Sequence, residues 1–182
     1  MRNRIIFALI LSGLITACAQ VPDKKGGHYE LFKLQNIAKT DIDMVADTHV
    51  KQTLLQLKLL TEKLYKRNPR EWKKAKLGSR EAAITRIFQR PIPSVNGRRG
   101  VASIRLAFDP HYKGDRVFAY IAGLASMLSI SYNDKEDFYL FDSLDAQKIY
   151  HASRNVEVAA WLLSSKKDRH GALYLLSSGT GR

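Results

Sequence analysis

Apolar and small side chains recur every three or four residues from Thr40 to Lys66, and this spacing restricts the architecture more than any other part of the sequence. An α-helix has about 3.6 residues per turn, so side chains at this spacing share one face. They are Ile42, Ala46, His49, Thr53, Leu57, Leu60 and Leu64. The pattern predicts a helix over 40–66, with Thr40 as its N-cap and Asp43 as the acidic partner three residues on.

Capping and turn residues predict further helices on both sides of this one. Asn68 precedes Pro69, which suits the first helical position, and Glu71 is placed to reach back to the cap before Gly78 ends the helix. Ser79, Asp115 and Ser143 are each followed by helical patterns that they can cap. The predicted helices are 29–38, 69–76, 80–89, 116–132 and 144–165. Between them, Arg90–Gly100 contains two prolines and an Asn-Gly pair, which is the composition of a loop.

The helix over 116–132 is apolar on nearly all sides, so we expect it at the centre of the core. Its small residues are Ala119, Ala122, Gly123 and Ser126, and they permit close packing of a neighbouring helix. Two short apolar segments, 101–108 and 173–176, fit either a helix or an extended segment. Alternation of period two is nearly absent elsewhere. The sequence therefore predicts an all-α, compact, multi-helix single domain with at most one short extended segment at 101–108 or 173–176.

The N-terminus has the order of basic, apolar and small residues that marks a secretory leader. Arg2 and Arg4 precede the apolar run Ile5–Leu11, and the segment ends in Ile15-Thr16-Ala17-Cys18. This ending resembles the lipobox of bacterial lipoprotein signal peptides. The resemblance implies cleavage before Cys18 and covalent attachment of a diacylglycerol and an N-acyl chain to that cysteine. A membrane-spanning anchor is the alternative, but the apolar run is shorter than the roughly 20 residues a span needs.

The leader divides the chain into a signal peptide over 1–17, a lipidated cysteine with a flexible tether over 18–27 and a helical periplasmic domain over 28–182. Cys18 is the single cysteine, so no disulfide is expected. The later residues resemble uncharacterised helical lipoproteins of proteobacteria over their length rather than through a sharp motif. In Gram-negative lipoproteins a residue other than aspartate after the cysteine implies sorting to the outer membrane, and Ala19 fits that rule. We therefore expect a cell-envelope location, facing the periplasm or the cell surface.

Positive charge is concentrated in residues 63–99. The whole chain has 30 Lys and Arg against 17 Asp and Glu, a net charge of +13. Residues 63–99 hold twelve of the basic residues and only two acidic ones, Glu71 and Glu81. Such clusters attract anionic partners, which at an envelope membrane are anionic lipid, cell-wall polymer or an acidic envelope protein, whereas export argues against nucleic acid. An ordinary solvated helix face is the alternative. The candidate partner-binding residues are Lys66, Arg67, Arg70, Lys73, Lys74, Lys76, Arg80, Arg98 and Arg99.

Catalytic and metal-binding motifs are not found in the sequence. The five histidines have no i, i+4 pair and no neighbouring cysteine, so a metal site is not predicted. Ser164 precedes Lys167 at the spacing of serine-lysine acyl enzymes, but their companion motifs are missing. We therefore expect a non-enzymatic binding or assembly module without a cofactor. Two alternatives stay open: an envelope hydrolase whose non-local site uses His49, on the predicted buried face, or His111, and a subunit of a larger envelope complex.

Overall fold

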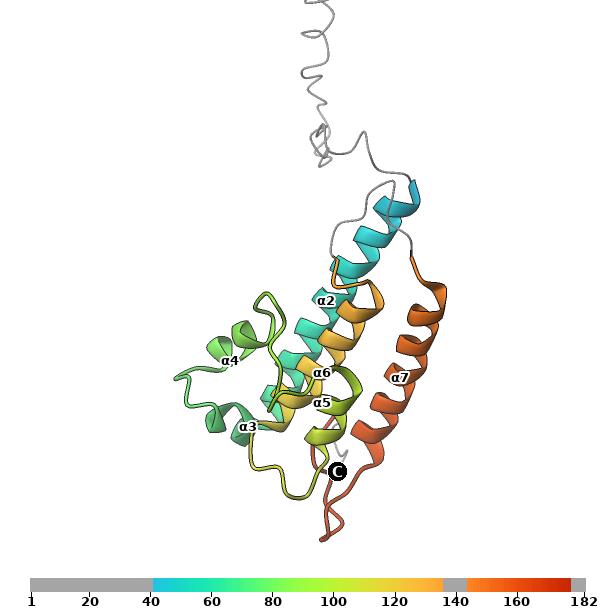
Figure 1. The fold of residues 1–182 in the computed structure, drawn as a ribbon. Helices are drawn as coiled ribbons and strands as arrows, with labels where there is room; N and C mark the ends of the chain where they lie inside the picture. The colour runs from blue at the N-terminus through green and yellow to red at the C-terminus, as the bar shows by residue number, and fades with distance from the viewer. Residues whose placement is uncertain (1–40, 136–143, 178–182) are drawn as a thin grey trace, which may run out of the picture. The chain divides into compact units, whose positions relative to one another are not determined.

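The computed structural model describes residues 41–135 and 144–177, which belong to one compact unit. This part of the chain contains six α-helices and no β-strand, so the all-α, single-domain prediction is confirmed (Figure 1). The helices are α2 (Asp41–Arg67), α3 (Pro69–Lys74), α4 (Arg80–Ile87), α5 (Gly100–Ala107), α6 (Arg116–Ser131) and α7 (Ala146–Ser165). The predicted leader with Cys18, the predicted tether, the helix predicted over 29–38, Thr40 and Ser143 lie outside the described residues.

Helix α6 forms the centre of the core, as its apolar composition predicts. It is buried from Arg116 through Met127 and contacts each of the other five helices. In Figure 1 it runs between α2 and α7, with α5 beside it. Its closest neighbour is α5, because Gly123 has no side chain: a Cβ there would lie 2.7 Å from the backbone nitrogen of Ile104. The predicted role of small residues in close helix packing is therefore confirmed at Gly123.

Helix α2 confirms the long helix predicted over 40–66, and Ala46, Leu57 and Leu64 of the predicted face are buried. His49, expected on the buried face, is exposed, and Val50 is buried instead. Burying the apolar side chain of Val50 is favourable, whereas moving a polar imidazole out of water costs free energy. Thr61 and Tyr65 are also buried, and the Thr61 hydroxyl donates to the Leu57 carbonyl at 2.6 Å.

The predicted cap of α3 is wrong, although Pro69 does begin the helix. Asn68 makes no side-chain capping bond. Its amide instead donates to the carbonyls of Leu64 and Leu176, and its oxygen accepts from the Leu176 N–H at 2.9 Å. Glu71 points inward rather than back to the cap, because it has partners in the core. Helix α3 ends at Lys74, before Gly78, and Lys76 takes a left-handed conformation with φ 54°.

The next two predicted features are confirmed. Ser79 caps α4, since its hydroxyl accepts from the Ala82 N–H at 3.0 Å. Residues 90–99 form a loop in which Val95 and Arg98 exchange backbone hydrogen bonds of 2.9 Å around Asn96-Gly97, and Gly100 begins α5. Both turn residues have positive φ, which explains the Asn-Gly pair.

The two ambiguous segments take different structures. Residues 101–108 fall almost entirely within α5, so the extended alternative is wrong there. Near the C-terminus, Leu173 forms an isolated antiparallel bridge with Lys167. Helix α7 is capped by Asp145, whose carboxylate accepts from the N–H groups of Gln147 and Lys148. The prediction that Ser143 caps a helix from Leu144 therefore places the start two residues too early.

Candidate functional site

The predicted cations gather mainly where α2 ends and α3 and α4 begin. Lys66 and Arg67 form the last turn of α2, Arg70 and Lys73 lie on α3, and Lys76 and Arg80 flank the turn into α4. Figure 1 shows α3 beside the lower end of α2, with α4 on the same side of the unit but further up, and each pair of these three helices is in contact. We call this set the basic corner: Lys66, Arg67, Arg70, Lys73, Lys76 and Arg80.

Most cations of the basic corner carry no compensating carboxylate. Arg80 pairs with Glu81 at 2.8 Å, and the Lys73 ammonium lies 5.7 Å from the centre of the Trp72 ring. The other four are Lys66, Arg67, Arg70 and Lys76; all are exposed, and none forms an ion pair within the part of the chain that the structure describes. Their field is therefore directed into solvent, where an anion can approach.

A shallow hollow of about 460 Å³ lies in the basic corner. Lys66 of α2 and Arg80 of α4 both line it, and the partly buried Trp72 contributes to its wall. The hollow brings together cations that are fourteen positions apart in the sequence. Glu81, which pairs with Arg80, lines the hollow as well, so of its two cations only Lys66 has no carboxylate partner in the described part of the chain.

Lys74 differs from its neighbours because the fold uses its charge. Its ammonium pairs with Glu71 Oε1 at 2.6 Å and donates to the Gly114 carbonyl at 3.3 Å. The other oxygen of Glu71 accepts from the Arg116 N–H at 2.7 Å, at the start of α6. Lys74 thus ties α3 to α6, so we exclude it from the basic corner.

Arg98 and Arg99 lie on the 90–99 loop and do not line the hollow of the basic corner. Arg99 pairs with Asp134 at 3.0 Å. Together with Arg90 and Pro91 it lines a separate depression of about 380 Å³. The structure therefore divides the predicted binding residues between two places.

A buried polar network lies behind the basic corner and was missed from the sequence. The Tyr65 hydroxyl donates to Asp115 Oδ2 at 2.7 Å, and the Phe118 N–H donates to Asp115 Oδ1 at 2.9 Å. Burial raises the pKa of Asp115 above its usual value, although both hydrogen bonds act in the opposite direction. Burial and the neighbouring Asp115 charge raise the pKa of the Tyr65 phenol well above its usual range. The sequence predicts Asp115 as a helix cap, but no local pattern predicts its hydrogen bond with Tyr65, which is 50 residues away.

We expect Asp115→Asn to change how stability depends on pH. Because the folded pKa of Asp115 lies above the unfolded value of 3.8, folding favours the protonated acid, and this contribution is lost as pH rises through the folded pKa. The unfolding free energy of the wild type minus that of Asp115→Asn should therefore decrease as pH rises above the unfolded pKa of 3.8. Urea denaturation over a pH series measures the difference.

Glu81→Gln is the matched control for the pH series. A hydrogen bond from its own backbone N–H and the contact with Arg80 lower the pKa of Glu81. Its wild-type minus variant difference should therefore rise with pH. A difference for Asp115→Asn that is flat or rising would show that burial does not govern this carboxyl.

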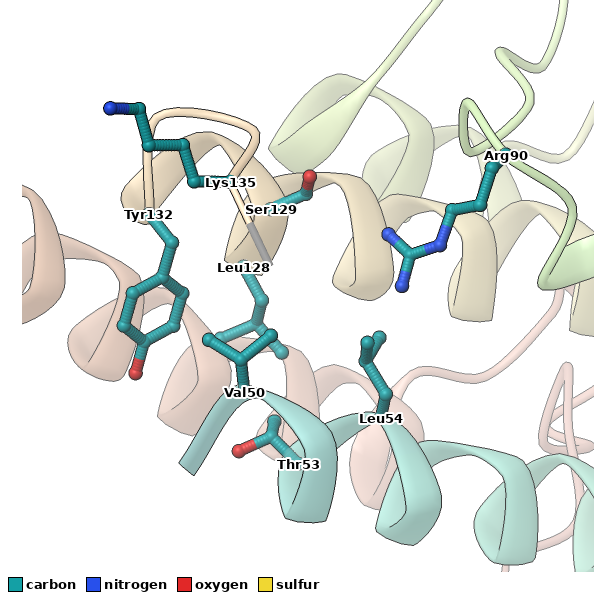
Figure 2. A pocket seen from close by; sticks show the side chains of 8 residues that line it. All are labelled: Val50, Thr53, Leu54, Arg90, Leu128, Ser129, Tyr132 and Lys135. Carbon is teal, nitrogen blue, oxygen red and sulfur yellow. The ribbon is translucent and has the colours of Figure 1, made fainter. Parts of the chain in front are cut away.

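A crevice between α2 and α6 is too small for a ligand. Figure 2 shows Val50 and Leu54 of α2 facing Leu128 of α6, with Arg90 and Lys135 at its edges. Its volume is about 10 Å³, room for roughly one water molecule. We interpret it as a gap in helix packing.

The residues considered for catalysis are not brought together. His49 and His111 are both exposed, on α2 and on the loop before α6. The Ser164 hydroxyl donates to the Trp161 carbonyl. Within residues 41–135 and 144–177, no group of three His, Cys, Asp or Glu side chains is arranged to hold a metal ion. His28 lies outside the described residues.

Comparisons with known proteins give no family for this chain. No protein-family model, curated protein or solved structure matches it. Among the described helices, none combines the length and the apolar character that crossing a bilayer requires.

Proposed function

We propose that this protein is an envelope lipoprotein, acylated at Cys18, that works as a non-catalytic binding module with the basic corner as its contact surface. The leader pattern supports the anchor and the location. The distribution of cations on α2, α3 and α4 supports the contact surface.

The observation that carries this proposal is the uncompensated charge of the basic corner. Five of its six cations have no carboxylate partner in the described part of the chain, and Lys66 and Arg80 line one hollow. A Lys or Arg near an anionic membrane surface contributes about 1 kcal/mol to association, and the contribution is screened by salt. An ordinary solvated face would more often intersperse acidic residues.

The partner is an anionic component of the envelope, either lipid headgroups, a cell-wall polymer or an acidic protein. A lipid anchor holds the domain close to such surfaces, so individually weak contacts suffice. No cofactor is needed for this role.

Reversing charge at the basic corner should weaken a salt-sensitive association with the envelope partner. In Arg70→Glu/Lys73→Glu/Lys76→Glu, capture of the envelope partner at low salt should fall by about tenfold or more, because attraction becomes repulsion. Lys74 is left intact because it stabilises the fold. Affinity capture of the acylated chain from isolated envelopes, at low and high salt, measures the effect.

The matched control reverses the same number of charges elsewhere on the surface, in Lys58→Glu/Arg105→Glu/Lys113→Glu. All three side chains are exposed, on α2, α5 and the loop before α6. Both triple variants should keep wild-type helicity by circular dichroism. If the two variants lost capture equally, the association would depend on the net charge of the protein and not on the basic corner. Undiminished capture by the corner variant would refute the proposal.

A second candidate function, assembly into a larger envelope complex, is favoured by exposed apolar side chains. On α7, Trp161 is 63% exposed, and on α2, Leu55 and Leu59 are also exposed. Contiguous apolar patches mark surfaces that bind other proteins, and these side chains are the candidates for such a patch.

A further inference from the structure

The outer face of α7 carries an ordered row of four side chains. Tyr150, Arg154, Glu157 and Trp161 follow one another at spacings of four, three and four residues. All four are more than half exposed. The opposite face carries the buried residues Ala152, Ala159 and Leu163, and α7 is in contact with α6. We call these four residues the α7 row.

The spacing of the α7 row is that of a coiled-coil seam. Positions d, a, d and a of a heptad repeat are separated by four, three and four residues, and they form the contact line between two helices. Tyrosine, tryptophan and arginine are also the residues most enriched among those that dominate binding energy at protein interfaces. The α7 row therefore has both the geometry and the composition of a helix-to-helix contact.

The α7 row is self-complementary when a second copy runs in the opposite direction. Its midpoint falls between Asn155 and Val156, with an aromatic residue at each end and opposite charges inside. A two-fold axis at this midpoint places each Tyr150 against Trp161 of the other copy. The same axis places each Arg154 against Glu157 of the other copy. Such reciprocal contacts define an isologous interface.

We propose that the α7 row is a homodimer interface in which α7 pairs antiparallel with α7 of a second copy. Within one chain, Arg154 and Glu157 already form an ion pair one turn apart. In the dimer the two pairs join into a four-member network at the centre, with aromatic contacts on both sides. A parallel arrangement would set arginine against arginine and glutamate against glutamate, so the charges select the antiparallel orientation.

The charge pattern favours a second copy over other occupants. A lipid surface could bind the two aromatic rings, but it offers no pair of opposite charges to complement the Arg154 and Glu157 side chains between them. An unrelated protein would need no symmetry about the midpoint. The residues flanking the axis at mirrored positions, Ser153 with Val158 and Gln147 with Ser164, are uncharged, so they do not oppose the pairing. One helix pair buries less than a standard interface, so we expect a weak, concentration-dependent dimer.

Charge exchange tests this interface and its orientation together. In a dimer of Arg154→Glu, glutamates would face each other across the two-fold axis, and in a dimer of Glu157→Arg, arginines would. We expect the repulsion between like charges to weaken each dimer by about tenfold or more. The double variant Arg154→Glu/Glu157→Arg should restore it. An equimolar mixture of the two single variants should form heterodimers more readily than either forms homodimers. Sedimentation velocity of the full acylated chain in a mild detergent, over a concentration series, reads out all four cases.

Lys58→Glu, an exposed charge reversal on α2, is the control and should dimerise like the wild type. Trp161→Ser should weaken the dimer without loss of helicity, because its ring lies in solvent in the single chain. A wild-type chain that stays monomeric over the whole series would overturn the proposal. So would single variants that dimerise normally, or a double variant that fails to recover. Monomers that bind vesicles through Trp161 would assign the α7 row to a membrane instead.

Discussion

Replacing Gly123 with alanine is expected to destabilise the domain by about 1–3 kcal/mol, because the added methyl group overpacks the contact between α6 and α5. The new Cβ would lie 2.7 Å from the Ile104 nitrogen and 3.0 Å from the Gly100 carbonyl oxygen. Both are backbone atoms, which cannot swing aside as a side chain does. The two helices would have to separate, and α6 is the helix on which the core is built. Equilibrium urea denaturation measures the loss.

The sign of this effect separates the packing explanation from helix propensity. In the interior of a solvent-exposed helix, replacing glycine with alanine stabilises the helix by about 1 kcal/mol. An increase in stability would therefore show that α5 and α6 do not approach as closely as the structure has them. Ala102→Val, at an exposed position of α5, is the control for side-chain enlargement and should cost no more than about 0.7 kcal/mol.

Replacing Arg116 with methionine is expected to cost about 3 kcal/mol or more, because it removes the hydrogen bonds that a charged guanidinium donates to three buried or partly buried carbonyl groups. The Arg116 guanidinium donates to the carbonyls of Ala107, Asp109 and Tyr112, at 2.5, 2.9 and 2.9 Å. It also lies 4.5 Å from the centre of the Tyr174 ring. The side chain thus joins the end of α5, the following loop and the C-terminal segment. Methionine keeps much of the volume but supplies no hydrogen bond.

Arg105→Met is the matched control, since Arg105 is exposed on α5 and should tolerate the same change with little loss. Arg116→Lys should fall between the two, because an ammonium lacks the planar fork that serves several acceptors at once. Thermal and urea denaturation of the three variants provide the measurement. Similar stability of Arg116→Met and Arg105→Met would show that the buried guanidinium contributes little.

The helices were predictable from the sequence because their signals are local. The three-to-four residue spacing gave α2, and the Ser79 and Asp115 caps gave the starts of α4 and α6. The errors arose where a side chain has a stronger partner far along the chain. Asn68 was read as a cap, but it binds the backbone of Leu176, 108 residues away. Glu71 was read as part of the same cap, but it binds the start of α6.

The candidate site was predictable as a charged stretch but not as a surface. Composition alone cannot separate Lys74, held by Glu71, from Lys73, which lies over Trp72. Nor does sequence order show that Lys66 and Arg80 line one hollow while Arg99 pairs with Asp134 elsewhere. These distinctions depend on contacts between helices. A short-range periodicity also cannot decide between His49 and Val50, since both are one turn from Ala46.

Acylation of Cys18 is the premise on which the proposed location and anchoring depend, and one measurement tests it directly. Intact-protein and peptide mass spectrometry of the chain, isolated from membranes of a Gram-negative host, would identify the mature N-terminus. We expect a chain that begins at Cys18 and carries the mass of a diacylglycerol and an N-acyl group. An unmodified chain that retains Met1 and fractionates with the cytosol would contradict the account.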